Sequence, residues 1–395
     1  MSAQIDQSRP AKPPAWRDPE KRAIFFQVIV LGLVLYVVYA LIHNTMLNLA
    51  ARGIASGFDF LSTSSGFSIA ETLIDYNESS SYGRVFWVGL LNTLLVSSLG
   101  IVFATTLGFI MGVARLSSNW IVAKIAMVYV DTLRNVPLLL QLFFWYFAVL
   151  RPLPSPRQAY AWFDSLFLSN RGLFMPKPVF ESGFWLIWIA LAIAVVAIFV
   201  MRHWAKKRQE QTGQQFPVFF VALGIFVGLP LLAAIVTGFP LSWDMPQLKG
   251  FNFKGGMVLT PEFCSLLFAL SIYTSSFIAE IVRSGILAVN KGQTEAAYAL
   301  GLRPNLTTRL IIIPQALRVI IPPLTSQYLN LAKNSSLAAA IAYPDLVAVF
   351  AGTTLNQTGQ AVEIMAMTLS VYLGLSLLIS TLMNWYNARM ALVER

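Results

Sequence analysis

About eight long apolar runs dominate this chain, and polar connections separate them. The hydrocarbon core of a bilayer is about 30 Å thick and needs roughly 20 apolar residues per helix, so runs of this length can cross it. Only 12% of the residues are charged and 56% are hydrophobic, figures that exclude an ordinary soluble protein. The runs cover residues 23–42, 85–113, 125–149, 184–201, 218–239, 263–286, 314–331 and 361–385. The sequence therefore predicts an all-α polytopic membrane protein with about eight transmembrane helices.

Lys and Arg are unequally divided between the two sides of the predicted bundle. The side that holds both termini has eighteen of them, and the opposite side has eight. Cytoplasmic loops carry an excess of basic residues, so we expect both termini in the cytoplasm. The same asymmetry accounts for the net charge of +10, and no nucleic-acid partner is expected. Because no small-residue cleavage site follows the first run, that run is predicted to be an anchor and not a signal peptide.

Residue types that make catalytic or metal sites are scarce. The chain has one cysteine, Cys264, and two distant histidines, His43 and His203, so neither an internal disulfide nor a metal site is expected. The sequence contains no G-x-x-x-x-G-K-[ST] loop to bind nucleotide phosphates, and no Ser-His-Asp, Cys-His or two-carboxylate arrangement stands out. We therefore predict a chain that is not an enzyme and holds no cofactor of its own.

The apolar runs divide the chain into segments. We expect a cytoplasmic tail at 1–22, an extra N-terminal helix at 23–43, a periplasmic segment at 44–84, two core helices at 85–150, a periplasmic loop at 151–183, an inserted hairpin of two membrane helices at 184–239, a periplasmic loop at 240–262, and three further core helices at 263–395 with a cytoplasmic loop at 290–313. Neither the segment at 44–84 nor the loop at 151–183 has the character of an independent domain.

Two stretches are polar where membrane depth is expected. The third run contains Asp131, Arg134, Asn135 and Pro137, and the seventh run is followed by "LAKNSSLAAAIAYPDL". Irregular backbone at membrane depth is tolerated only where it is buried in protein or lines an aqueous cavity. These stretches therefore predict broken helices beside a translocation pathway.

Intramembrane charges mark candidate pathway residues, because insertion of a central Asp, Lys or Arg costs about 2.5 to 3.5 kcal/mol. The set contains both cations and anions, so it could bind a small substrate that carries both charges. The alternative is local: charges three residues apart satisfy each other on one helix, and the serines cap the next helix. The candidate pathway residues are Asp131, Arg134, Asn135, Glu280, Lys333, Asn334, Ser335 and Ser336.

The connection between the sixth and seventh runs reads "NKGQTEAAYALGLRPNLTTRLIIIPQALR" and predicts two short helices. Asn290 or Thr294 suits the start of the first helix. Gly301, with Pro304 soon after, suits a left-handed stop, and Asn305 suits the start of the second helix. The alanines between them leave little side-chain bulk, so the first helix is shaped to approach a groove in a partner.

The spacing of this loop resembles the EAA signature of ABC importer permeases. The matching residues are Glu295, Ala296, Ala297, Gly301, Ile311, Ile313 and Pro314, with isoleucine at 313 where the family usually has leucine. In that family the loop is a coupling helix that sits in a cleft of the ATPase. The resemblance implies an ATPase-coupling role for Glu295, Ala296, Ala297, Gly301, Arg309 and Pro314. The alternatives are that Glu295 complements a helix dipole and that Arg309 is a membrane-flanking cation.

Further stretches resemble the polar amino-acid (HisMQ-like) branch of these permeases. They are "YVDTLRNVPLLLQLFFWYF", "IAEIVRSGILAVNKGQTEAA" and "LAKNSSLAAAIAYPDL", while "ARGIASGFDFL", "GFSIAETLIDY" and the extra helices are similar to the larger permease subunits of general L-amino-acid importers, of the AapQ and BztB type. The resemblance implies a type I (MetI-like) permease core in a Gram-negative inner membrane.

The same resemblance implies the partners. They are a second, homologous permease chain in a heterodimer, two ATP-binding subunits that hold ATP and Mg²⁺, a periplasmic amino-acid-binding protein, the lipid bilayer and an L-amino-acid substrate. Two rival functions remain open at this point. An ion-coupled secondary transporter would use the intramembrane carboxylates but has no need of an EAA loop. A scaffolding membrane protein would have no need of the intramembrane cations.

Overall fold

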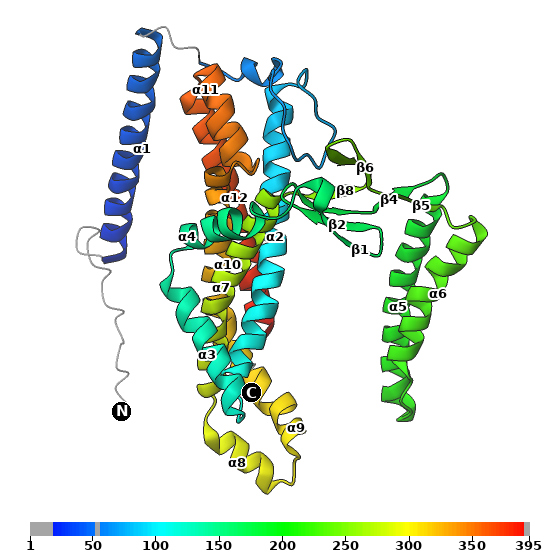
Figure 1. Ribbon diagram of the computed structural model, residues 1–395. Helices are drawn as coiled ribbons and strands as arrows, with labels where there is room; N and C mark the ends of the chain where they lie inside the picture. Colours follow the sequence, from blue (N-terminus) through cyan, green and yellow to red (C-terminus); the bar gives the residue numbers. More distant parts are fainter. Residues whose placement is uncertain (1–18, 52–55, 391–395) are drawn as a thin grey trace, which may run out of the picture.

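The computed structural model describes residues 19–51 and 56–390, and it is predominantly helical (Figure 1). Within these residues, seven helices are long and apolar enough to cross a membrane, or eight if one bent pair counts as a single span. This confirms the predicted all-α membrane fold with about eight crossings. The longest helices are α1 (Pro19–Ala51), α2 (Tyr82–Ala114), α5 (Phe184–Thr212), α6 (Val218–Val236), α7 (Pro261–Leu287), α10 (Ile313–Asn334) and α12 (Ala361–Met390).

Shorter elements connect or extend these helices. The helical ones are η1 (Asp59–Ser62), α3 (Trp120–Asn135), α4 (Leu138–Phe143), η2 (Phe144–Leu150), η3 (Pro156–Gln158), α8 (Lys291–Ala299), α9 (Pro304–Thr307), η4 (Thr308–Ile312), η5 (Ser335–Ile341), η6 (Val347–Thr354) and α11 (Leu355–Thr358). The strands are β1 (Tyr160–Trp162), β2 (Leu166–Ser169), β3 (Gly172–Met175), β4 (Lys177–Phe180), β5 (Leu241–Asp244), β6 (Gln247–Lys249), β7 (Asn252–Lys254) and β8 (Met257–Leu259).

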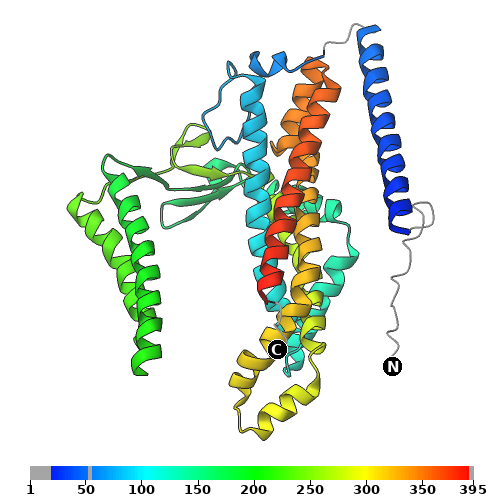
Figure 2. The same ribbon diagram turned by 180° about the vertical axis from the view of Figure 1, so that it is seen from behind.

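The core is built on the close approach of α2 to α7, with α3, α10 and α12 packed around this pair (Figures 1 and 2). Small residues make the approach possible. A Cβ atom at Gly108 would lie 2.5 Å from Cγ2 of Ile278, and one at Gly112 would lie 2.7 Å from the carbonyl oxygen of Ala279. In a membrane, close packing between helices replaces the hydrophobic driving force, and small residues at the interface allow it.

The third apolar run is broken, as the sequence predicted. Helix α3 and the α4–η2 segment meet at an angle of 107°. Val136 is extended (φ −95°, ψ 125°) because the ring of Pro137 disfavours a helical residue before it. The side-chain amide of Gln141 donates to the carbonyls of Leu133 (2.9 Å) and Val136 (3.0 Å), so it satisfies acceptors that the interrupted helix leaves open.

The seventh run is also followed by a break. Helix α10 tightens into the 3-10 helix η5, and Ala342 then adopts a left-handed conformation (φ 60°). The chain turns through Tyr343 and Pro344 and continues as the π-helical segment η6 before α11 and α12. Left-handed backbone at a residue other than glycine is uncommon, and it occurs mostly where the surrounding structure fixes it.

The two segments predicted to be loops contain eight short strands. A four-stranded antiparallel sheet has the order β1-β2-β3-β8, and β4 pairs with β5 and β6 with β7. The sheet joins residues before the α5–α6 hairpin to residues after it, since Phe174 of β3 is opposite Val258 of β8. The strands are too short to give a periodic hydrophobic signal, which is why sequence analysis missed them.

Helices α1 and α5–α6 stand apart from the core, on opposite sides of it (Figures 1 and 2). The apolar window of α1 is 0% buried and that of α6 is 0% buried, while that of α7 is 67% buried. Helix α5 packs against α6. The two ends of the molecule differ clearly: α8 and α9 project from one end of the core, here called the α8 end, and the strands lie towards the other, here called the sheet end (Figure 1).

Candidate translocation pathway and coupling loop

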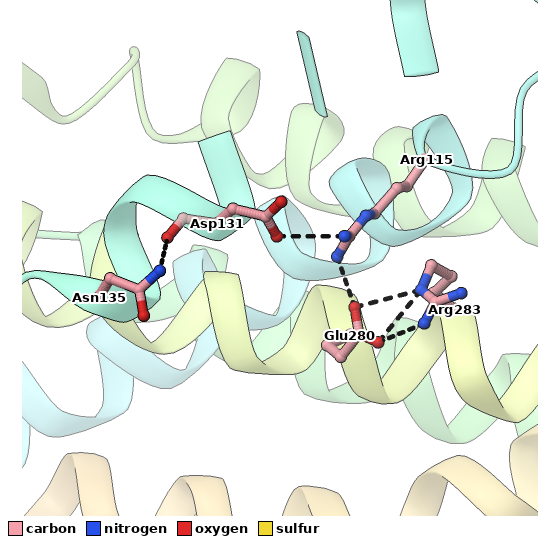
Figure 3. Close-up of polar contacts among 5 residues, drawn as sticks. All are labelled: Arg115, Asp131, Asn135, Glu280 and Arg283. Atoms are coloured by element: carbon pink, nitrogen blue, oxygen red, sulfur yellow. Dashed lines mark hydrogen bonds and ion pairs between the residues drawn. The ribbon is translucent and has the colours of Figure 1, made fainter. Parts of the chain in front are cut away.

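An arginine at the end of α2 joins three helices at the α8 end of the core (Figure 3). Nη2 of Arg115 lies 3.1 Å from Oδ1 of Asp131 on α3, and its Nη1 lies 2.5 Å from Oε2 of Glu280 on α7. Arg283, also on α7, contacts Oε1 of Glu280 at 2.5 Å. The side chain of Arg115 is only 18% exposed. We call these four residues the Arg115 cluster.

Only one of the two ion pairs that the sequence allowed within single helices is present in the structure. The pair Glu280–Arg283 forms within α7, as expected for charges three residues apart. The pair Asp131–Arg134 does not form, because Asp131 turns to Arg115 instead. Arg115 lies between the second and third apolar runs and its partner Glu280 is 165 residues away, so no local spacing in the sequence could have revealed the contact.

Arg134 and Asn135 lie beside this cluster on α3. The guanidinium of Arg134 is 5.2 Å from the ring centroid of Phe277 on α7, a cation–π contact. The side-chain amide of Asn135 donates to the carbonyl of Asp131 at 2.7 Å (Figure 3). Four of the predicted pathway residues therefore lie together at the α8 end: Asp131, Arg134, Asn135 and Glu280.

The other predicted pathway residues lie at the junction of α10 and η5. Lys333 is exposed, whereas Ser335 is fully buried. The hydroxyl of Ser335 donates to the carbonyl of Ala332, and that of Ser336 donates to the carbonyl of Lys333, both at 2.8 Å. The alternative that these serines cap the next helix does not hold, since η5 continues directly from α10 and both hydroxyls bond back to carbonyls of α10.

A buried polar cluster fixes the break after η5 against α2, and sequence analysis missed it. The side-chain amide of Asn92 donates to the carbonyl of Pro344 at 2.9 Å. The hydroxyl of Thr93 accepts the backbone N–H of Leu346 at 3.0 Å, and the hydroxyl of Tyr343 donates to the carbonyl of Asn92 at 3.3 Å. Buried backbone groups outside regular structure need such partners, so these side chains specify the path of the broken helix.

Asp345 is the fully buried carboxylate of this region. Its Oδ1 accepts the backbone N–H of Ala348 at 2.8 Å, at the start of η6, and its Oδ2 accepts the hydroxyl of Tyr372 on α12 at 3.4 Å. The sequence signal that could have identified Asp345 is its position just before an apolar helical segment, because aspartate is favoured at the start of a helix.

The sheet end carries a second group of carboxylates. The hydroxyl of Tyr146 on η2 donates to Oε1 of Glu262 at 2.7 Å. Burial and the nearby charge of Glu262 raise the pKa of Glu71 to about 8, although a backbone hydrogen bond from Thr260 opposes the shift. Oε1 of Glu71 is buried without a partner among the described residues. Glu71 lines a cavity of about 470 Å³ between residues 56–81, here called the outer segment, α2 and β8.

The loop with the EAA spacing forms a separate short helix, α8, at the α8 end (Figure 1). The side chain of Asn290 accepts the N–H of Gly292 at 2.8 Å, so Asn290 and not Thr294 starts the helix. Gly301 has φ 78°, as predicted. The N–H of Leu302 donates to the carbonyl of Ala297 at 3.1 Å, and that of Gly301 donates to Tyr298 at 2.9 Å, the two bonds of a Schellman stop.

The surface of α8 is small and mostly exposed. Glu295 and Ala296 are exposed, whereas Ala297 is 1% exposed and faces the rest of the loop. Leu300 is 81% exposed at the end of the helix. The expectation that Asn305 starts the second helix is wrong, because Arg303 precedes α9 and Pro304 is its first residue.

The last two residues of the predicted coupling set follow α9. Arg309 lies exposed in η4, and Pro314 lies in the first turn of α10. The helix is continuous from Pro304, so Pro314 removes one intrahelical hydrogen bond, in agreement with the π-helical turn η4 just before it. The loop at residues 290–313 therefore leads directly into α10, the helix that ends at the break before η5.

Comparisons with known proteins show the family to which this chain belongs. Residues 211–392 match the family of binding-protein-dependent transport system inner membrane components. YhdX of Escherichia coli K12, a putative amino-acid ABC transporter permease, is 57% identical over 381 residues, covering 96% of this chain and 97% of that protein. This chain belongs to the amino-acid ABC transporter permeases. The permease is also 54% identical over 381 residues to AapQ of Rhizobium johnstonii, a general L-amino acid transport system permease, covering 96% of this chain and 95% of that protein.

A third relative of the permease is BztB of Rhodobacter capsulatus, from a glutamate/glutamine/aspartate/asparagine transport system. It is 44% identical over 409 residues, which cover 96% of each chain. These relatives confirm the predicted resemblance to the AapQ and BztB type, and with it a multi-pass membrane protein of the type I importer permease class. The similarity extends over almost the whole chain and includes the extra helices α1, α5 and α6.

Proposed function

We propose that this permease is the transmembrane subunit of an ATP-driven, binding-protein-dependent importer of L-amino acids. It forms the translocation pathway with a homologous permease chain, in a heterodimer, above two ATPase subunits that bind ATP and Mg²⁺. A periplasmic binding protein delivers the amino acid at the sheet end. The α8 end and both termini face the cytoplasm of a Gram-negative cell, in agreement with the distribution of Lys and Arg.

The observation that carries this proposal is the form of α8. It is a short, exposed helix that ends in a glycine stop, has small residues on its surface and projects beyond the core (Figure 1). Such a projecting helix, here called the knob, fits a groove in a partner protein. Its residues have the spacing of the coupling loop of ABC importer permeases. The substrate class follows from the names of the relatives and from the paired cations and anions near the pathway.

The route of coupling follows from the connections of α8. Movement of α8 is transmitted to α7 through the short connection at residues 288–290 and to α10 through α9 and η4. Helix α10 ends at the break near Lys333, while the Arg115 cluster links α7 to α2 and α3. Binding of ATP would close the ATPase pair, shift α8 and open the pathway to the periplasm, and hydrolysis would reset it.

The decisive experiment is reconstitution of the complete importer in proteoliposomes with its binding protein. Gly301→Pro removes the left-handed stop, and Glu295→Lys reverses the charge of the knob, so both should abolish ATP-dependent uptake and weaken copurification of the ATPase. The control is Lys207→Glu, another charge reversal on an exposed residue, at the far end of α5. It should leave uptake within about twofold of wild type.

Three results would count against the proposal. Normal uptake and normal ATPase binding in both α8 variants would remove the coupling role. Uptake that needs a proton or sodium gradient and ignores ATP would favour an ion-coupled secondary transporter instead. Uptake unchanged by Arg134→Ala and Lys333→Ala would favour a scaffolding role.

A further inference from the structure

The strands at the sheet end are tied closely to membrane-spanning helices. Three residues separate β4 from α5, four separate α6 from β5, and one separates β8 from α7. An extended chain covers at most about 3.6 Å per residue, so the strand ends lie within about 18 Å of the helix ends. The strands therefore lie at the membrane surface and not in a domain that projects far from it.

The hairpin of β1 and β2 presents aromatic side chains at this surface. Tyr160 is 55% exposed, Trp162 is 46% exposed and Phe163, at the turn, is 90% exposed. Phe163 and Asp164 have φ of 54° and 50°, which is unusual for a bulky residue such as phenylalanine and is compatible with a tight hairpin turn. An exposed phenylalanine in a left-handed conformation is costly in water unless something covers it.

The same region is rich in exposed cations. They are Arg157, Arg171, Lys177, Lys249 and Lys254, and none of them forms an ion pair with another described residue. Apart from Arg151, the accompanying charges at residues 151–183 and 237–260 are the acidic residues Asp164, Glu181 and Asp244, so this region is positive. A positive region at the sheet end is opposite to the overall charge asymmetry of the chain and needs a cause of its own.

We propose that the β1–β2 hairpin inserts its aromatic tip into the lipid–water interface of the leaflet at the sheet end, while the neighbouring cations bind anionic phospholipid headgroups. Trp and Tyr favour this interface because one part of the ring system is apolar and another makes hydrogen bonds. Clusters of basic residues beside a membrane bind anionic lipids by charge. The lipid–water interface covers Phe163, and the anionic headgroups neutralise the cations. Lipid therefore explains both the exposed aromatic tip and the exposed cations.

The arrangement of the elements favours lipid over a soluble protein. In both views β1 and β2 extend from the core towards the α5–α6 hairpin, at the level where that hairpin begins (Figures 1 and 2). Spanning helices therefore flank the strands on two sides. The insertion fixes the depth of the strands, and through the short connections it fixes the depth of α5 and α6, which lack other support from the core.

The test uses the reconstituted importer in nanodiscs. Phe163→Cys, in a Cys264→Ser background, is labelled with an environment-sensitive fluorophore and compared with Ser79→Cys, an exposed position in a turn of the outer segment. Helix α2 begins just after this turn and is 33 residues, or about 50 Å, long, so it extends beyond a hydrocarbon core of about 30 Å. Nitroxide-labelled phospholipids should quench the label at 163 about twofold or more and leave the label at 79 nearly unchanged.

Lipid composition provides the second arm of the test. Quenching at 163 should be stronger in phosphatidylglycerol than in phosphatidylcholine, and the double variant Lys177→Gln/Lys249→Gln should remove this difference. Equal quenching at 163 and 79, or none at 163, would overturn the proposal. It would also be overturned if the label at 163 changed only on addition of the binding protein, or if the partner permease alone shielded it from lipid.

Discussion

At the scale of single residues, the ionisation of Glu71 links the stability of the fold to pH. Its folded-state pKa of about 8 lies above the usual value of 4.5, because burial and Glu262 disfavour its charged form. Between these pH values the folded state binds more protons than the unfolded state, so stability falls as pH rises. The stabilising contribution is complete below pH 4.5 and is lost as pH rises through 8.

Glu71→Gln should therefore flatten the pH dependence of stability. Glutamine has the shape of the protonated side chain and cannot ionise. The variant should therefore be slightly less stable than wild type at pH 5. At pH 9 it should be more stable than wild type, by up to a few kcal/mol. The measurement is the melting temperature of the purified permease in detergent across this range. Glu78→Gln, an exposed carboxylate of the same segment, is the control. Parallel pH curves for wild type and Glu71→Gln would contradict the assignment.

At the scale of helices, the contact between α2 and α7 depends on glycine. A Cβ at Gly112 would lie 2.7 Å from the carbonyl oxygen of Ala279 and 2.8 Å from Cβ of Val282. Gly112→Val should force these helices apart and destabilise the permease by about 1–3 kcal/mol or more. Gly224→Val on α6, where nothing lies within 4 Å of the Cβ position, should change the melting temperature little. Equal losses in the two variants would show that the helix pair has room to adjust.

Helices were predictable from the sequence to the degree that their signals are local. Length and hydropathy identified the spans, Pro137 identified the break between α3 and α4, and Gly301 identified the stop of α8. The strands were not predictable, because each has only three or four residues, and the pairs β3–β8 and β4–β5 join residues on either side of an inserted helical hairpin. The partners of Arg115 and Asn92 are distant in sequence as well, so their contacts became visible only in the folded chain.

At the scale of the whole molecule, the two ends of the core are held together differently. At the sheet end, neutral hydrogen bonds from Asn92 and Thr93 fix the break after α10. At the α8 end, Arg115 bridges α2, α3 and α7 by charge. Helix α8 follows α7 after three residues, and the Arg115 cluster ties α2 and α3 to α7. We therefore propose that a shift of α8 moves α3 together with α7.

Arg115→Gln tests this connection. Loss of the guanidinium leaves Asp131 without its ion-pair partner and leaves Glu280 paired with Arg283 alone. The link from α3 to the other helices therefore weakens, while α7 keeps its internal ion pair. We expect a several-fold lower ratio of amino acid taken up to ATP hydrolysed, and destabilisation of a few kcal/mol at most, because the charges are only partly buried. Asp131→Asn should have a similar effect on the ratio, since it removes the same link.

Arg283→Gln is the matched control for Arg115→Gln, because its ion pair with Glu280 lies within α7 and joins no second helix. Its ratio of uptake to ATP hydrolysis should stay near that of wild type. Arg115→Lys should restore only part of the ratio, because a single ammonium lacks the planar fork with which the guanidinium contacts two carboxylates at once. If Arg283→Gln reduced the ratio as much as Arg115→Gln, the charge of Glu280 alone would matter, and the bridge between α2, α3 and α7 would have no part in coupling.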